Sequence, residues 1–298
     1  MKSCSTVLIS NLSAGRGGAK RKIELATFCE EMKARGIEVQ VLNTTAPGEA
    51  TIMAVDAVER GAGTVIVSGG DGTVNEALQG LVGTTARLAV WPRGTANVLA
   101  RELGLPTNPS KIIEMITREK TKRIYPGCAI QEETGKRRYF FLMAGIGLDA
   151  SVVRGVRPGL KQRIGKAAYW YSGLGHLADW KPIPFTIELE GQSIVATFAA
   201  IGKGSLYGGG LSVTPRARLD SPQFEICVMT AERRLRYLRL LPYVVLGGLE
   251  KDQRDVRFIQ TTRARVTGDV AVQVDGELIG NPPMKFEVVT EPLEVVVP

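Results

Sequence analysis

Apolar and polar residues follow two different periods along the first 120 residues of this 298-residue chain. Short apolar runs such as "TVLISN" and "TVIVSGG" are typical of buried strands, whereas the segments between them repeat their apolar positions at helical spacing. In "AKRKIELATFCEEMKARG" the helical pattern stops at Gly36, a residue that commonly ends helices. Strands and helices that alternate in this way predict a doubly wound, mostly parallel α/β sheet with helices on both faces.

The pattern changes after residue 123. Short segments of alternating polarity such as "FTIELEG", "FEICVMT" and "MKFEVVTEPLEVVV" follow one another, separated by turn residues. Many short strands of this kind predict an antiparallel β-sandwich-like domain. We therefore expect two domains, an α/β domain over residues 1–123 and a β-rich domain over residues 124–298.

Two segments with helical spacing interrupt the β-rich half. The first contains Tyr169, Trp170 and Tyr171, and its aromatic residues are expected to belong to a core. The second, "AERRLRYLRLLPYVVLGGLE", combines arginines with a leucine-rich face, as a helix at a membrane surface does. An ordinary surface helix packed on the sandwich explains that pattern equally well.

Composition limits the chemistry. The formal net charge of +8 predicts attraction to polyanions, which include nucleotide phosphates, anionic membranes and nucleic acid. Nucleic acid is disfavoured because no aromatic residues are interleaved with a basic stripe. The single histidine, His176, is expected to pack in the core. The chain has neither an apolar run of about 18 residues nor an export signal, so we expect a cytoplasmic protein without a transmembrane helix.

Three glycine-bearing loops follow the predicted parallel strands: "NLSAGRGG", "SGGDGTVN" and "PRGTANVLAR". Ligands of such sheets bind beyond the carboxyl ends of the strands. A glycine-rich turn exposes backbone N–H groups, and the helix that follows adds partial positive charge at its first turn. The three loops therefore predict a phosphate site.

Asp71 is the carboxylate of the second loop. A carboxylate so close to a phosphate would be repelled unless a divalent cation or its water shell lay between them, which indicates Mg²⁺. Alternatively, Asp71 only caps the helix that follows. Two other nucleotide motifs do not fit: "GLKQRIGK" has the wrong spacing for a P-loop, and "GIGLDA" is not followed by the helix of a dinucleotide fold.

The segments "NLSAG", "SGGDGTVNE" and "PRGTANVLARELGLP" resemble the catalytic domain of the diacylglycerol kinase, sphingosine kinase and bacterial lipid kinase superfamily, most closely its soluble bacterial members. The resemblance continues through "FFLMAGIGLDASVV" and "VQVDGELIG" and so covers nearly the whole chain. Gly-Gly-Asp-Gly-Thr also occurs in NAD kinases and phosphofructokinases, so the resemblance implies a sheet of that type. The segment "GTANVLAR" and the late "DGE" separate this chain from those enzymes.

The resemblance implies roles for individual residues. It assigns Asp275 as the general base and Asp71 as the carboxylate that holds catalytic Mg²⁺ through water. On local sequence alone, Asp275 and Glu277 are explained equally well as exposed residues of a hairpin, because Asp-Gly is a common turn. Leu12 stands where the family usually has proline, which relaxes the first loop without removing its amides. The implied nucleotide-binding residues are Asn11, Ser13, Ala14, Gly15, Arg16, Thr44, Gly69, Gly70, Asp71, Gly72, Thr73, Asn75 and Thr95.

One segment departs from the family pattern. The family often has Asp-Asp-Gly in its second domain, where it helps to hold a structural Mg²⁺. This chain has Asp220, Ser221 and Pro222 instead, with Asp220 one position out of register. The sequence therefore supports the catalytic ion better than the structural one.

These observations predict an ATP-dependent, Mg²⁺-dependent lipid kinase that phosphorylates a lipid hydroxyl, with diacylglycerol and its product phosphatidic acid as the best fit. Such an enzyme would be cytoplasmic and bound peripherally to membranes that contain anionic phospholipid. Two alternatives stay open: a kinase for a soluble acceptor such as NAD, and a non-catalytic protein that binds anionic membranes. The sequence determines neither the acceptor lipid nor the oligomeric state, a homodimer included.

Overall fold

The computed structural model describes most of the chain: residues 5–11, 18–148, 150, 181–206, 212–251 and 254–298. Its contacts divide the chain into two compact units, Met1–Ile124 with Glu291–Pro298, and Tyr125–Thr290. The predicted aromatic helix around Tyr169 and the single histidine, His176, lie outside the described residues.

The first unit is built on one six-stranded sheet in the order β2-β1-β3-β4-β18-β5. Its strands are β1 (Ser5–Ser10), β2 (Val39–Asn43), β3 (Ala62–Gly69), β4 (Arg87–Pro92), β5 (Thr121–Ile124) and β18 (Leu293–Val296). Its helices are α1 (Gly18–Ala34), α2 (Glu49–Glu59), α3 (Asp71–Leu81), α4 (Val98–Glu102) and α5 (Pro109–Thr117). Strands β1 to β4 all run parallel, and β18 pairs parallel with β4. Only β5, at the edge of this described sheet, runs antiparallel to its neighbour β18.

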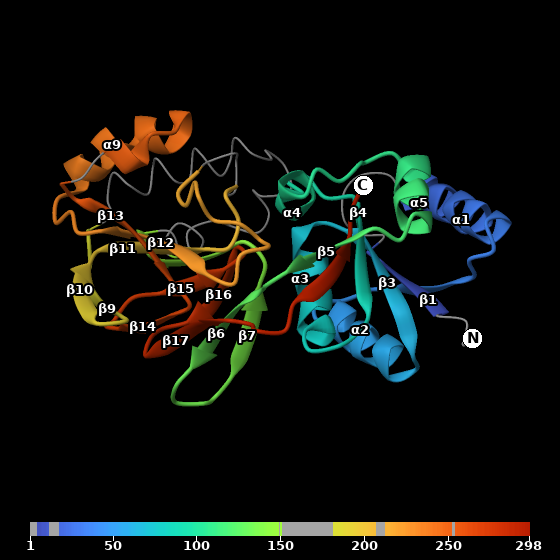
Figure 1. The fold of residues 1–298 in the computed structure, drawn as a ribbon, viewed down its shortest axis with the longest axis horizontal. Coiled ribbons are helices and arrows are strands. Elements are labelled where there is room, and N and C mark those ends of the chain that lie inside the picture. The colour runs from blue at the N-terminus through green and yellow to red at the C-terminus, as the bar shows by residue number, and fades with distance from the viewer. Residues whose placement is uncertain (1–4, 12–17, 149, 151–180, 207–211, 252–253) are drawn as a thin grey trace. The chain divides into compact units, whose positions relative to one another are not determined.

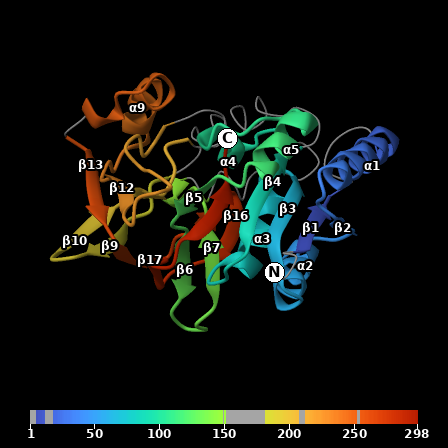
Figure 2. The same ribbon diagram turned by 45° about the vertical axis from the view of Figure 1, so that its right-hand side comes forward.

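This arrangement confirms the predicted doubly wound sheet. Val65, Ile66 and Val67 of β3 are fully buried because helices cover both faces. Helices α2 and α3 pack together on one face, and α1 and α5 pack together on the other (Figures 1 and 2). From β1 the chain moves outward to β2 and then returns to β3 on the other side, so the switch point of the sheet lies between β1 and β3.

The second unit contains two six-stranded antiparallel sheets, with orders β10-β9-β14-β17-β6-β7 and β13-β12-β11-β8-β15-β16. The strands of the first are β6 (Gly127–Gln131), β7 (Arg137–Phe140), β9 (Phe185–Leu189), β10 (Gln192–Ala196), β14 (Arg263–Thr267) and β17 (Met284–Val288). Those of the second are β8 (Met143–Gly147), β11 (Phe198–Gly202), β12 (Phe224–Met229), β13 (Val256–Thr261), β15 (Val272–Val274) and β16 (Glu277–Gly280). Side chains from both sheets, among them Ile187 and Ile226, form one buried core, as the predicted sandwich requires.

The end of the chain does not follow the sequence prediction. We expected all of residues 124–298 in the β-rich domain, yet β18 joins the sheet of the first unit between β4 and β5. The short apolar run "LEVVV" predicts a strand but not the sheet that receives it, because the partner strands lie far away in the sequence.

One helix of the second unit is described. Helix α9 (Arg234–Leu246) matches the predicted arginine- and leucine-rich segment and is followed by a 3-10 turn at Leu249–Lys251. Within the described residues, no helix has both the length and the apolar character that crossing a membrane requires.

Candidate active site

The turns that follow β1 and β3 are joined at the switch point of the first unit. Asn11 donates its backbone N–H to the carbonyl of Ser68 at 3.0 Å, and its side-chain Nδ2 donates to Oγ1 of Thr73 at 3.2 Å. The amide of Thr44 donates to the carbonyl of Ser10 at 2.9 Å, so Thr44 lies buried beside the end of β1. The structure thus brings Asn11, Thr44 and Thr73 together around the strand ends.

The turns after β3 and β4 touch through their backbones. A Cβ atom added to Gly94 would lie 2.6 Å from the Cα of Gly70, closer than real side chains come. The amide of Arg93 also donates to the carbonyl of Gly69 at 2.7 Å. By contrast, a Cβ on Gly72 would meet nothing within 4 Å, so the start of α3 has an open side. Positions 70 and 94 therefore require glycine, because the backbones of the second and third turns come too close for a side chain between them.

Asp71 is the first residue of α3 and follows its N-cap. The N-cap position is taken by Gly70, which is extended and makes no side-chain cap hydrogen bond. Oδ1 of Asp71 accepts a hydrogen bond of 3.4 Å from the amide of Leu99 in α4. Burial raises the pKa of Asp71, while the amides of Leu99, Val98 and Asn97 act in the opposite direction. A carboxylate that loses hydration on burial in this way is stabilised by a nearby cation.

Asn97 shapes the third turn and was not among the residues that the sequence singled out. Its φ of 44° is left-handed, a conformation that asparagine tolerates better than most residues. Its side chain accepts from the amide of Gly94 and donates to the carbonyl of the same residue, both at 2.9 Å. Thr95 in this turn is exposed. The sequence does contain a signal for this turn: "RGTAN" places an asparagine three residues after a glycine, and both residue types favour turns.

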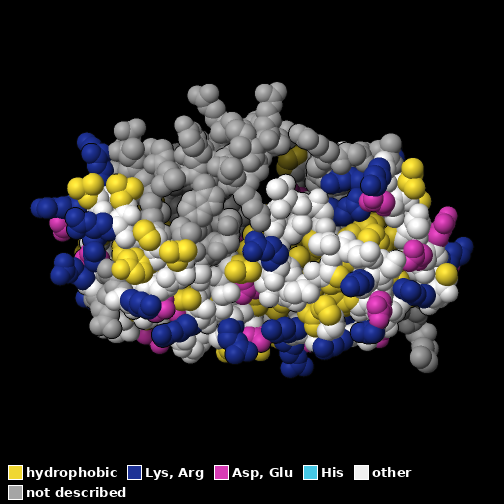
Figure 3. Space-filling model, turned by 90° about the horizontal axis from the view of Figure 1, so that it is seen from above, with side chains coloured by type: hydrophobic (Ala, Val, Ile, Leu, Met, Phe, Trp, Pro, Cys, Tyr) yellow, Lys and Arg dark blue, Asp and Glu magenta, His cyan; other side chains and the backbone are white. Residues whose placement is uncertain are grey.

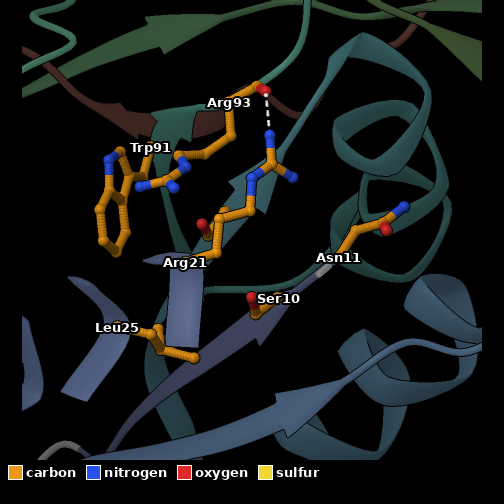
Figure 4. Close-up of a pocket in the computed structure, with 7 residues that line it drawn as sticks. Ser10, Asn11, Arg21, Leu25, Trp91 and Arg93 are labelled. Atoms are coloured by element: carbon orange, nitrogen blue, oxygen red, sulfur yellow. Dashed lines mark hydrogen bonds between the residues drawn. The ribbon is translucent and has the colours of Figure 1, made fainter. Parts of the chain in front are cut away.

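A small pocket at the carboxyl ends of β1, β3 and β4 contains two arginines that the sequence analysis missed (Figure 4). Arg21 of α1 donates from Nη2 to the carbonyl of Arg93 at 3.2 Å, whereas its Nη1 is buried and has no hydrogen-bond partner among the described residues. Burial, and next the charge of Arg93, lower the pKa of Arg21. Arg93 lies over the ring of Trp91, 4.8 Å from its centroid, and pairs with Glu24 at 2.5 Å.

The remaining predicted residues of the first unit divide into two groups. Asn75 is buried in α3, where its carbonyl accepts from Nε2 of Gln79 at 2.9 Å. Ser13, Ala14, Gly15 and Arg16 lie outside the described residues, so their predicted contacts with phosphate remain predictions.

Asp275 occupies a tight hairpin in the second unit. Strands β15 and β16 pair with Val274 opposite Glu277, so Asp275 and Gly276 form the two-residue turn that Asp-Gly favours. Both residues have positive φ, 46° and 85°. The carboxylate turns toward the chain between β7 and β8 and accepts three amide hydrogen bonds, from Phe141 at 2.7 Å and from Leu142 and Met143 at 3.0 Å each. Its orientation is therefore set by main chain.

Asp220, the predicted ligand of a structural ion, faces a guanidinium group. Its two oxygens accept hydrogen bonds from Nε and Nη2 of Arg218 at 3.0 and 3.1 Å. In the part of the chain that the structure describes, no three His, Cys, Asp or Glu side chains gather as metal ligands would. The "GIGLDA" motif is not a nucleotide turn either, because Gly145 and Gly147 lie within β8.

Glycine turns joined at the switch point of a parallel sheet, followed by an antiparallel sandwich, define a two-domain phosphotransferase. Comparison with known proteins agrees: the model "Diacylglycerol kinase catalytic domain" matches residues 5–129, and "YegS C-terminal NAD kinase beta sandwich-like domain" matches residues 143–297. The chain belongs to the diacylglycerol kinase-like family of lipid kinases, and it is an enzyme of that kind.

Individual relatives are similar over almost their full length. The diacylglycerol kinase of Mycobacterium tuberculosis is 32% identical over 295 residues, which cover 97% of this chain and 94% of the relative. The diacylglycerol kinase of Bacillus subtilis is 28% identical over 98% of this chain and 95% of its own. A crystal structure of a diacylglycerol kinase from Bacillus anthracis has the same fold, with a TM-score of 0.75 at 22% identity over 100% of this chain and 98% of that one.

Proposed function

We propose that this enzyme transfers the γ-phosphate of ATP, with Mg²⁺, to the hydroxyl of a membrane lipid, and that diacylglycerol is the acceptor and phosphatidic acid the product. The observation that carries the proposal is the set of joined turns around Asp71, in a chain whose relatives are named diacylglycerol kinases. Phosphoryl transfer needs little covalent chemistry from the protein and depends mostly on positioning and charge neutralisation.

Backbone amides and arginines are suited to hold the nucleotide phosphates. The first N–H groups of an α-helix have no partner within the helix, and the helix dipole places partial positive charge there, so the start of α3 favours an anion on the side left open at Gly72. Nη1 of Arg21 is buried and finds no partner in the part of the chain that the structure describes, and an unpaired buried donor is costly unless a ligand accepts from it. A phosphate oxygen is the natural acceptor, because guanidinium groups bind phosphate through charge-assisted hydrogen bonds.

Asp71 fits a role as the carboxylate that holds the catalytic Mg²⁺. Its carboxylate is largely buried, and burial raises its pKa although amides of the next turn partly oppose that rise, so a cation would stabilise its charged form. When bound, Mg²⁺ would neutralise charge on the phosphate oxygens. In this role Asp71 would work through water, as its family position implies.

Asp275 is proposed as the general base that takes the proton from the attacking lipid hydroxyl. Three amides hold its carboxylate in one orientation, which a positioned proton acceptor requires. Aspartate in solution has a pKa of about 3.9 and is a weak base toward an alcohol. The proton should therefore move late, as the oxygen bonds to phosphorus.

Helix α9 is proposed as the element that meets the membrane. Tyr237 and Leu240 are buried and anchor its inner face, with the Tyr237 hydroxyl 2.6 Å from Oγ1 of Thr197. Leu235 and Leu246 are 63% and 85% exposed. At 100° per residue both lie on the side of the helix opposite to Tyr237.

Basic side chains accompany these exposed leucines. At the left of Figure 3, over α9, yellow hydrophobic side chains lie among dark-blue basic ones. Arg233, the N-cap of α9, and Arg239 within the helix are both exposed. Apolar residues that enter the acyl boundary, together with arginines at the level of the headgroups, characterise interfacial helices. This composition favours membranes that contain anionic phospholipid.

A radiolabelled-ATP assay with lipids in mixed micelles tests the proposed reaction. We expect label in diacylglycerol with the wild type, and a loss of about 10²–10⁴-fold in Asp275→Asn, the usual contribution of general acid–base catalysis. Asp269→Asn is the matched control, since Asp269 is exposed shortly before the same hairpin. Undiminished labelling in Asp275→Asn would refute the general-base role, and label in NAD alone would indicate the soluble-acceptor kinase.

Vesicle sedimentation without nucleotide tests the membrane role of α9. Binding to anionic vesicles should fall strongly in Leu235→Ser/Leu246→Ser and should weaken as salt increases. Ile52→Ser, at a residue of α2 that is 69% exposed, should bind like the wild type. Equal binding by all three proteins would contradict the assignment of α9. Binding without any ATP turnover would favour the non-catalytic alternative.

A further inference from the structure

Lys203 is a buried cation that the proposed reaction does not use. It follows β11 directly and has 0% of its surface exposed. Its Nζ donates to three main-chain carbonyls, those of Arg218 at 3.5 Å, Gln223 at 3.2 Å and Ser221. All three carbonyls belong to the six residues 218–223, which lead into β12. Asp220 lies in the same segment.

The chemistry of these partners is that of a cation site. Main-chain carbonyl oxygens from one short loop, with a carboxylate close by, are the donors that Mg²⁺ and Ca²⁺ use in proteins. An ammonium group has three N–H donors and no acceptor, so three carbonyls satisfy it completely. Burial lowers the pKa of Lys203 to about 8, with the charge of Asp220 acting in the opposite direction. At neutral pH the side chain therefore remains mainly protonated.

We propose that the ammonium group of Lys203 takes the place of the structural Mg²⁺ that the family resemblance implies for the second domain. The 218–223 segment is then held together by a cation that belongs to the chain. The stability of this unit should consequently be independent of divalent ions. This inference does not rest on the proposed lipid kinase reaction.

Geometry opposes a metal ion at the same carbonyls. Nζ of Lys203 lies within hydrogen-bond reach of all three carbonyl oxygens, so it fills the position that an ion bound to them would take. A divalent ion among these oxygens would also lie against the like charge of Lys203. The carboxylate of Asp220 faces Arg218 with both oxygens. The residues present therefore do not fit a structural Mg²⁺.

The surroundings of Lys203 hold its backbone in place. The amides of Lys203 and Gly204 both donate to the carbonyl of Leu142, at 2.7 and 3.0 Å, and Oγ1 of Thr214 donates to the carbonyl of Gly204 at 3.1 Å. A Cβ added to Gly202 would lie 2.1 Å from Oγ1 of Thr214, so the packing on this side is tight. The lysine stem is thus directed at the carbonyls and has little room to leave.

Thermal unfolding of the full-length protein, without nucleotide or lipid, tests the proposal. With Asp71 replaced by asparagine, so that the proposed catalytic ion has no carboxylate, the melting temperature of an otherwise wild-type chain should be the same in EDTA, Mg²⁺ and Ca²⁺. Lys203→Met should lower it by about 5 °C or more, because three buried carbonyls lose their donors. Lys285→Met is the matched control, since Lys285 is 59% exposed, and should melt close to the wild type. An Asp71→Asn protein that EDTA destabilises and Mg²⁺ restores would overturn the proposal.

A second variant asks whether the carbonyls can serve a metal once the lysine is gone. Lys203→Ala/Ser221→Asp removes the ammonium and adds a carboxylate beside the three oxygens. In the Asp71→Asn background, this double variant should gain several degrees in melting temperature with Mg²⁺ or Ca²⁺, whereas the chain with Lys203 and Ser221 intact should gain nothing. No response to either ion would contradict the interpretation of these carbonyls as a cation site. If Lys203→Met fails to fold, chelation of the Asp71→Asn protein still decides whether a metal is needed at this segment.

Discussion

Replacing Gly94 by alanine tests whether the candidate site depends on contact between the second and third turns. The added Cβ would lie 2.6 Å from the Cα of Gly70 and 2.8 Å from Oδ1 of Asn97. Neither the backbone of Gly70 nor the hydrogen-bonded Asn97 side chain can yield without disturbing its own turn. Overpacking of this kind costs about 1–3 kcal/mol of folding free energy. For a unit of this size, the melting temperature should fall by roughly 2–10 °C.

Urea unfolding followed by circular dichroism measures this loss, and the KM for ATP measures the displacement of the turns. Gly72→Ala is the control from the same region, because a Cβ there meets nothing within 4 Å. It should leave the free energy of unfolding unchanged or raise it by about 0.5–1 kcal/mol, since alanine is favoured over glycine in a helix. Its open side faces the proposed phosphate site, so its KM should nevertheless rise. Equal stability of Gly94→Ala and Gly72→Ala would refute the inferred contact.

Two further substitutions probe buried polar groups. Asp71→Asn should abolish labelling of lipid yet raise the melting temperature of the nucleotide-free protein, because burial raises the pKa of Asp71 and its charged form opposes folding. The gain should be largest above that raised pKa and should vanish as the pH falls toward about 3.8, which a melting series against pH can follow. Tyr237→Phe removes the hydroxyl that lies 2.6 Å from Thr197 and should cost about 0.5–1.5 kcal/mol in urea unfolding. No loss in Tyr237→Phe would mean that this contact does not hold α9.

Part of the candidate site could be predicted because its determinants are local. Gly70 and Asp71 stand in a turn between an apolar run and a helical pattern, and such a turn at a strand end predicts an anion site in any doubly wound sheet. Asp275 and Gly276 likewise form the turn that their two-residue motif favours. Both inferences need only a few consecutive residues.

Other features could not be read from neighbouring residues. Arg21 and Arg93 are 72 positions apart and meet only because α1 packs beside the end of β4. The residues next to Lys203 in the sequence do not predict that three carbonyls from residues 218–223 accept hydrogen bonds from its ammonium group. Asp71 reaches the start of α4 for the same reason, since the partner is set by the approach of two turns.

The sequence by itself determined the two kinds of layer, the order of most strands and helices, and the glycine turns at the strand ends. Periodicity records which side of each segment is buried, and that information lies within the segment. Only the tertiary structure decided that β18 completes the first sheet, that Gly70 and Gly94 touch, and that Lys203 is enclosed by carbonyls. These contacts join segments that are far apart in the sequence. They depend on which strand can still accept a partner, which turns meet, and which buried charge still needs hydrogen-bond acceptors once the sheets have formed.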